Sequence, residues 1–166
     1  MSEHQKLTGP LHGLADLRHA ALINCIGNRC LNLPTTKLEA GDKNDIETQG
    51  VAIEFSIDGV GYSKSALADV NVAIAATNAY DGVIEQVSGT TCYYVLTIQA
   101  DDTLTVYKGN DDETTNLPGH ALLECAFCVI KVVATGGAFT FGTTDFDAGS
   151  IVSTFNDVTC LPSTAP

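Results

Sequence analysis

The chain has 166 residues, of which 45% are hydrophobic and 17% are charged, a composition typical of one globular domain with a weakly charged surface. Twenty acidic residues against eight basic ones give a net charge of −12, which argues against nucleic acid or an anionic membrane as a partner. No apolar run approaches the roughly 20 residues that span a bilayer. No apolar stretch follows Met1–Lys6, so we expect no signal peptide and synthesis in a cytoplasm.

Residues 1–50 are predicted to form an N-terminal arm. Thr8–Pro10 can start a short helix because proline suits a first turn, and an apolar stripe continues from there to Ile23. The segment 24–37 contains glycine, asparagine and proline and predicts an extended stretch. The segment 39–50 is polar and acidic, which is typical of a surface loop or linker.

Residues 51–166 are predicted to form a β domain, because apolar and polar residues begin to alternate at this point. The runs 51–57 and 60–64 flank Asp58-Gly59. This dipeptide is a strong hairpin signal, since both central positions of the favoured turn need a positive φ.

Further strand signals recur about every ten residues, with turn residues between them. The pattern predicts a second hairpin, a third hairpin, a strand before them and a strand after them. Their ranges are 92–98 with 103–108, 126–133 with 138–141, 70–74, and 151–158. The predicted fold class is therefore all-β, an antiparallel β-sandwich or small barrel built of hairpins, with an N-terminal arm that carries a short helix.

The six cysteines are predicted to be mainly buried thiols that act as small hydrophobic residues. They are Cys25, Cys30, Cys92, Cys125, Cys128 and Cys160. Cys125 and Cys128 have the spacing of a metal or redox half-site. They lie in a predicted strand, where residues three apart face opposite sides, so without a bend they cannot share a metal. We expect no metal and no other cofactor, and leave open a Cys25–Cys30 disulfide formed in an oxidising medium.

The histidines and acidic clusters match no catalytic motif, and we expect no catalytic, cofactor-binding or metal-binding residues and no enzyme activity. His12 and His19 share one face of the predicted helix and are interpreted as solvated. His120 follows a Pro-Gly turn with no nucleophile near it in the sequence. Acidic pairs such as Asp101-Asp102 are interpreted as turn carboxylates, since none has calcium-loop spacing. A glycosidase carboxylate pair is disfavoured because the sequence singles out no two of the twenty acidic residues, and because there is no tryptophan to form a sugar platform.

Tyr93, Tyr94 and Tyr107 are the aromatic residues that could form a stacking platform. With a net charge of −12 a nucleic-acid site is disfavoured, and we interpret Tyr93 and Tyr94 as one packed and one half-exposed side chain on opposite faces of a strand.

A series of short motifs, spread over residues 31–162, resembles small virion structural proteins of tailed bacteriophages and prophages. The motifs include Leu33–Thr36, Phe55–Gly59, Cys92–Tyr94, Pro118-Gly119, Ile130–Val132, Gly142–Asp145 and Leu161-Pro162. The resemblance implies a non-catalytic capsid decoration (cement) protein. Such a protein binds the outside of the shell, contacts the major capsid protein, forms homotrimers and resides in the virion. The alternative is a receptor- or carbohydrate-binding β module of a fibre, spike or tail, for which the three tyrosines are the aromatic candidates.

Overall fold

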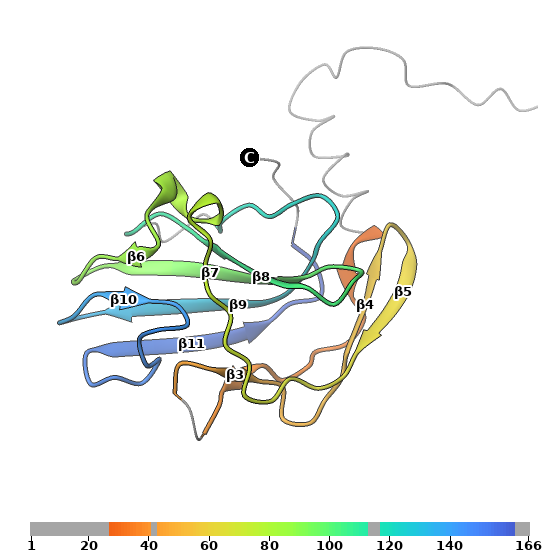
Figure 1. Cartoon of the computed structure of the whole chain (residues 1–166), viewed down its shortest axis with the longest axis horizontal. Coiled ribbons are helices and arrows are strands. Elements are labelled where there is room, and N and C mark those ends of the chain that lie inside the picture. Colours follow the sequence, from red (N-terminus) through yellow and green to blue (C-terminus); the bar gives the residue numbers. More distant parts are fainter. Residues whose placement is uncertain (1–26, 41–42, 113–116, 162–166) are drawn as a thin grey trace, which may run out of the picture.

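The computed structural model describes residues 27–40, 43–112 and 117–161 (Figure 1). The strands are β1 (Arg29–Cys30), β2 (Lys37–Leu38), β3 (Ile46–Glu47), β4 (Ile53–Ile57), β5 (Val60–Lys64), β6 (Glu85–Gln86), β7 (Thr91–Ile98), β8 (Leu104–Lys108), β9 (Cys125–Ala134), β10 (Phe139–Thr140) and β11 (Ile151–Asp157). Two 3₁₀ helices, η1 (Ala76–Asn78) and η2 (Tyr80–Gly82), lie between β5 and β6. The prediction of an all-β fold is confirmed, and the sheets do not close into a barrel.

A four-stranded antiparallel sheet with the order β11-β9-β7-β8 forms the main layer (Figure 1). The three-stranded sheet β1-β4-β5 lies at one end of it, and the two-stranded pairs β10-β6 and β2-β3 complete the sandwich-like arrangement. β9 is apolar along almost its whole length because both of its faces are covered. The main hydrophobic core lies on one side of the four-stranded sheet, and a smaller apolar cluster lies on the other.

Two of the three predicted hairpins are confirmed. β4 pairs with β5 across Asp58 and Gly59, whose φ angles of 51° and 78° are those that the turn requires. β7 pairs with β8, and the predicted final strand is β11. Local turn chemistry therefore identified these strand pairs correctly.

The third predicted hairpin is wrong. β9 pairs with β7 and β11, whereas β10 pairs with β6. The aromatic side chains after β9 explain the difference, because Phe139, Phe141 and Phe146 turn into the core and pack on one another instead of continuing the sheet.

The predicted strand over 70–74 does not form either. Val70 makes an isolated bridge with Ile46, while Val72 and Ile74 are buried without belonging to a strand. The alternation of apolar residues correctly predicted that Val72 and Ile74 are buried. It could not predict whether a neighbouring strand is available for them to pair with.

The described part of the predicted N-terminal arm packs against the β domain. The sequence pattern predicted a domain boundary at residue 50, but these contacts cross it. β1 pairs with β4, so Cys30 lies opposite Phe55. Ile46, in the segment expected to be a polar loop, is fully buried in the main core. The polar residues around these two positions concealed their burial in the sequence. The helix predicted over 8–23 lies outside the described residues.

A β-bulge in β9 changes the position of the Cys-x-x-Cys pair. Leu96 lies opposite Cys128 and Thr97 lies opposite Ala126, so Phe127 is the extra residue. As a result Cys125 and Cys128 both belong to the main core, and the prediction that they face opposite sides is wrong. The Cys-x-x-Cys spacing is visible in the sequence, but the bulge that brings both thiols to one face depends on the pairing of β9 with β7.

Candidate functional site

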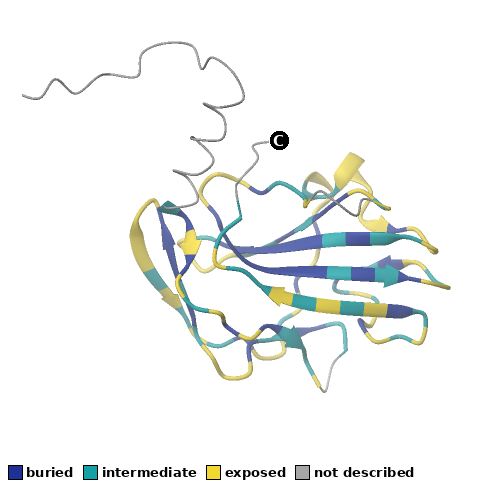
Figure 2. Cartoon of the chain, turned by 180° about the vertical axis from the view of Figure 1, so that it is seen from behind, coloured by how far each residue is buried: buried dark blue, intermediate teal, exposed yellow. Residues whose placement is uncertain are grey.

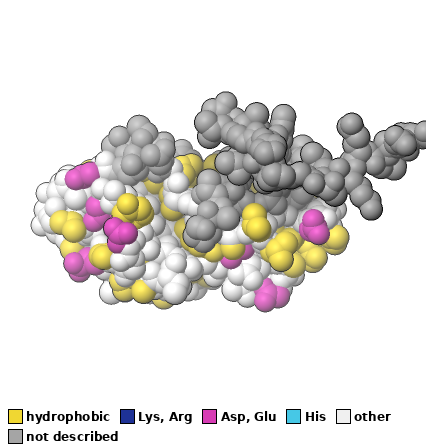
Figure 3. Space-filling view, turned by 90° about the horizontal axis from the view of Figure 1, so that it is seen from above, with side chains coloured by type: hydrophobic (Ala, Val, Ile, Leu, Met, Phe, Trp, Pro, Cys, Tyr) yellow, Lys and Arg dark blue, Asp and Glu magenta, His cyan; other side chains and the backbone are white. Residues whose placement is uncertain are grey.

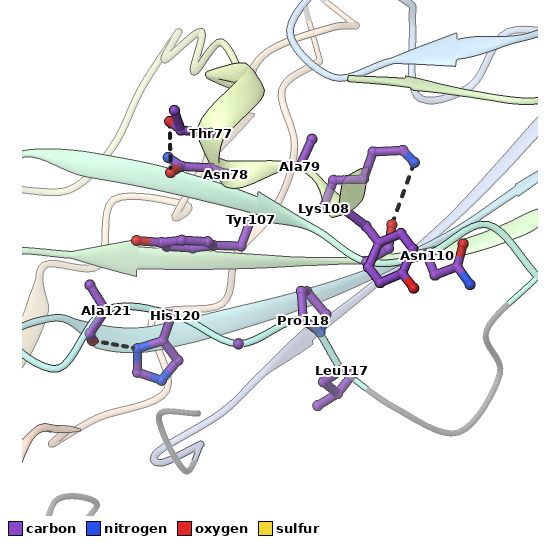
Figure 4. A pocket seen from close by; sticks show the side chains of 13 residues that line it. Thr77, Asn78, Ala79, Tyr107, Lys108, Asn110, Leu117, Pro118, His120 and Ala121 are labelled. Carbon is purple, nitrogen blue, oxygen red and sulfur yellow. Dashed lines mark hydrogen bonds between the residues drawn. The ribbon is translucent and has the colours of Figure 1, made fainter. Parts of the chain in front are cut away.

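A cleft of about 600 Å³ lies beside the end of β8 and is the candidate binding site of the described residues (Figure 4). Three segments line it: 77–80 around η1 and η2, 107–110 at the end of β8, and 117–121 before β9. Ala79 forms a parallel bridge with Lys108, which holds the first of these segments against the sheet edge. The volume falls in the range typical of small-molecule sites.

The ammonium group of Lys108 is not available to a ligand in this cleft. The Lys108 side chain is only 2% exposed, and its Nζ donates to Asp111 Oδ1 at 2.7 Å. The second oxygen of Asp111 accepts the Val87 backbone N–H at 2.8 Å. In Figure 4 the Lys108 side chain points away from Tyr107 and His120. The charge pair therefore joins β8 to the segment that follows β6, and it has a structural role.

His120 is buried and joins two parts of the chain. Its Nδ1 lies 3.0 Å from the Ala121 carbonyl oxygen, a contact drawn as a dashed line in Figure 4, and its Nε2 lies 3.3 Å from the Leu161 carbonyl oxygen. Both neighbours are acceptors, and a neutral imidazole carries one N–H, so it can donate to one of them at a time. With both ring nitrogens facing carbonyl oxygens, His120 holds the loop before β9 against the C-terminal segment, which does not suit a general base.

Tyr107 contributes an aromatic wall to the cleft (Figure 4). Burial and, to a smaller extent, the nearby Glu124 carboxylate together raise the pKa of Tyr107 to about 12, so the phenol stays neutral. Glu124 is buried and accepts hydrogen bonds from Thr97 Oγ1 at 2.7 Å and from Gln99 Nε2 at 2.9 Å. The carboxylate is therefore held by neighbours on the sheet and is not directed at a substrate.

The interpretation of Tyr93 and Tyr94 as one half-exposed and one packed side chain on opposite faces of a strand is confirmed. A further tyrosine, Tyr80, lines the cleft. Tyr94 is fully buried and donates to Gln86 Oε1 at 3.2 Å, whereas Tyr93 is half-buried in the smaller cluster on the opposite face. Tyr94 therefore cannot contact a ligand. Tyr80 is exposed and was missed because the segment around it, residues 75–83, has no strand or helix periodicity.

The acidic turn residues make contacts within the fold. Asp101 accepts the Thr103 backbone N–H at 3.1 Å, which lowers the pKa of its carboxyl group. Asp147 pairs with Lys43. In the segments 27–40, 43–112 and 117–161, no three histidine, cysteine or acidic side chains come together in a way that could hold a metal ion.

Four of the cysteines are free and buried, namely Cys30, Cys92, Cys125 and Cys128. The alternative of a disulfide between Cys25 and Cys30 is excluded because Cys30 is a free thiol. Cys160 is disulfide-bonded, so the interpretation of the cysteines as buried thiols does not extend to it. The Cys125 thiol forms a hydrogen bond with Cys30, and this contact and burial raise the pKa of Cys125.

The buried thiols predict a loss of stability in alkaline solution. Burial raises the pKa of Cys92 from 9.0 to about 11 and that of Cys128 to about 12. Unfolded thiols lose their protons near pH 9 while the folded ones keep theirs, so the stabilisation is complete below pH 9 and is lost as the pH rises toward 11–12. We expect the urea midpoint of unfolding to be lower at pH 10.5 than at pH 8. The variant Cys92→Ala should show a smaller decrease, and a midpoint independent of pH would contradict the prediction.

No protein-family model, curated protein or solved structure matches the chain. None of the helices in the described segments is long and apolar enough to cross a bilayer. The surface and the cleft are therefore the features that indicate a function.

Proposed function

We propose that this protein is a non-catalytic structural component of a tailed-bacteriophage virion, a capsid decoration protein that binds the outer shell and stabilises it. In this proposal three copies associate, and each contacts the major capsid protein. The sequence resemblance supports the phage context. The non-catalytic part of the proposal is supported by the contacts of three buried polar residues in the β domain. His120, Lys108 and Glu124 all form hydrogen bonds with other parts of the fold.

The observation that carries the proposal is a group of exposed apolar side chains at one end of the molecule. This end patch consists of Val60, Leu122 and Leu123, which are 56%, 54% and 65% exposed. Asn28 joins the two chain segments that carry the end patch. Its side-chain amide donates to the Leu122 carbonyl oxygen, and its side-chain oxygen accepts the Asp58 backbone N–H at 2.6 Å. Adjacent exposed leucines in a small domain are typical of a surface that another protein covers.

The charge of the face drawn in Figure 3 points to the kind of partner, and the exposed Arg29 beside Asn28 is a basic group near the end patch. Figure 3 shows hydrophobic and acidic side chains on the upper face of the molecule, and no lysine or arginine is visible among the described residues there. Such a face complements a protein surface with basic groups around an apolar centre. The same charge disfavours direct contact with the packaged nucleic acid.

The experiment is co-sedimentation of the protein with expanded capsids assembled from the major capsid protein of the same genome. We expect saturable binding, and a rise in the temperature at which the capsids disassemble, because bound protein stabilises the state that it binds. The double variant Leu122→Asp/Leu123→Asp should bind at least 10-fold more weakly, since it places two charges in the apolar contact.

The matched control is Val87→Asp, because Val87 is exposed to a similar degree, at 55%, and lies in the segment after β6. This variant should bind like the unchanged protein. Absence of capsid binding, or equal loss in the control, would contradict the proposal.

The cleft beside β8 favours a second candidate, a carbohydrate-binding module of a fibre, spike or tail. Tyr80 and Tyr107 offer aromatic faces, and Asn78 and Asn110 offer amide donors and acceptors, a combination that suits hydroxyl groups and apolar faces of neutral sugars. A glycan array distinguishes the two candidates. Binding of a neutral glycan that Asn110→Ala abolishes would favour the second, whereas a decoration protein that bridges capsomers needs no glycan.

A further inference from the structure

The four-stranded sheet has two unpaired edges. β11 forms one edge and β8 forms the other, and no other described strand pairs with the outer side of either, apart from the single bridge between Ala79 and Lys108 (Figure 1). An exposed edge presents a row of free backbone N–H and C=O groups, which is a template for pairing with another chain.

The register shows which residues of β11 present these groups. Thr135 donates to the Ser150 carbonyl and Val158 donates to the Phe127 carbonyl, so even-numbered residues of β11 bond to β9 and odd-numbered residues face outward. Two outward groups near the ends of the strand have partners within the chain, because the Ile151 N–H donates to Ala148 and the Thr159 carbonyl accepts from Cys30. Between them, Asp157 binds the Thr35 and Thr36 backbone N–H groups through its carboxylate, so the chain at 35–36 lies beside that end of the strand. Ser153 and Phe155, away from that contact, are left with their backbone groups directed outward.

The same argument applies to β8. Gly109 donates to the Tyr93 carbonyl and Gln99 donates to the Thr103 carbonyl, so odd-numbered residues of β8 bond to β7. Lys108 bridges to Ala79, which leaves Leu104 and Val106 with outward backbone groups. Each edge therefore offers two residues, spaced two apart, that can form a ladder with another strand.

Except at their last residues, Asp157 of β11 and Lys108 of β8, the two open edges lack the charges and prolines by which soluble proteins usually prevent such pairing. Residues 151–156 of β11 and 104–107 of β8 contain no charged residue and no proline. Figure 2 shows exposed and half-buried residues alternating along β11. Val152 is one of the exposed ones. An open edge with no charge and no proline in its middle is a predicted association site.

We propose that β11 of one copy pairs with β8 of a second copy, so that the sheet continues from subunit to subunit. The two edges are opposite sides of one sheet, so the contact is head to tail and generates a ring when the rotation closes. This inference rests on the proposed homotrimer, for which it supplies the contact surface. The end patch remains free to meet the capsid.

Hydrogen exchange on the full chain tests the inference together with light scattering after gel filtration. We expect a mass near three times 17.4 kDa and slow exchange of the amides of Ser153, Phe155, Leu104 and Val106 in the assembled protein. In an isolated monomer these outward amides would exchange like those of exposed loops.

The variant Ser153→Pro removes one outward N–H that the pairing with β9 does not use, and proline is tolerated on edge strands. It should yield a folded monomer, whereas the matched control Ser153→Ala keeps the N–H and should keep the assembly. If the proline variant does not fold, the exchange pattern of the unchanged protein decides.

The outcomes separate this inference from the proposed function. A trimer whose outward amides exchange rapidly, or a trimer that persists in a folded Ser153→Pro variant, overturns the edge contact and leaves the proposed trimer intact. A dimer with protection confined to β11 overturns the head-to-tail arrangement. A monomer at all concentrations that nevertheless binds capsids overturns both the contact and the preformed trimer.

Discussion

Replacing Phe146 with alanine is expected to lower the free energy of unfolding by about 3–5 kcal/mol, the range for removing a buried aromatic ring. Phe146 is fully buried, and its ring centroid lies 5.0 Å from that of Phe141, 5.3 Å from that of Phe139 and 5.4 Å from that of Phe155. These contacts hold the segment between β10 and β11 on the core side of the sheet. For a chain of this size, the loss corresponds to a decrease in the melting temperature of about 6–20 °C.

Differential scanning calorimetry measures this effect. The variant Phe146→Leu should lose less stability, since most of the volume remains, and Val83→Ala should change the free energy by less than about 0.5 kcal/mol because Val83 is exposed. A loss for Phe146→Ala as small as that for Val83→Ala would show that the aromatic cluster does not stabilise the fold.

Replacing Asp111 with alanine is expected to cost about 3–5 kcal/mol, because it leaves the buried Lys108 ammonium without its carboxylate partner and with only a long bond to the Gly109 carbonyl, at 3.4 Å. The substitution also removes the acceptor of the Val87 N–H, so the segment after β6 loses its tie to β8. Urea denaturation gives the free energy of unfolding and its change.

The double variant Lys108→Met/Asp111→Asn separates these contributions. It contains no unpaired charge, and the asparagine carbonyl still accepts the Val87 N–H, so it should be more stable than Asp111→Ala. Equal losses in the single and the double variants would mean that the ammonium group reaches water when Asp111 is absent.

The sequence alone was sufficient for features that depend on neighbouring residues. Asp58-Gly59 predicted the β4–β5 hairpin because the turn needs positive φ at both positions, and the structure has these angles. The runs that became β7, β8 and β11 were also identified, since a strand with buried side chains is apolar in an alternating or continuous pattern. The low charge and the lack of catalytic motifs predicted a binding protein, which stays a prediction.

Features that depend on distant residues required the tertiary structure. The partner of β9 could not be predicted, because several apolar runs compete for pairing and the choice depends on which aromatic side chains fill the core. The bulge at Phe127 is visible only in the register with β7. The cleft beside β8 combines three segments separated by loops, and Tyr80, His120 and the buried Lys108–Asp111 pair have no local pattern that indicates their position.

The boundary of the folded domain shows the same distinction. Cys30 and Ile46 lie in polar segments, and only the packing of β1 on β4 and of Ile46 in the core shows that the segments around them belong to the β domain. The sequence determined which residues prefer strands and turns, because those preferences are local. The tertiary structure decided which strands pair, which charges are buried and which edges stay open, because these depend on contacts between residues far apart in the chain.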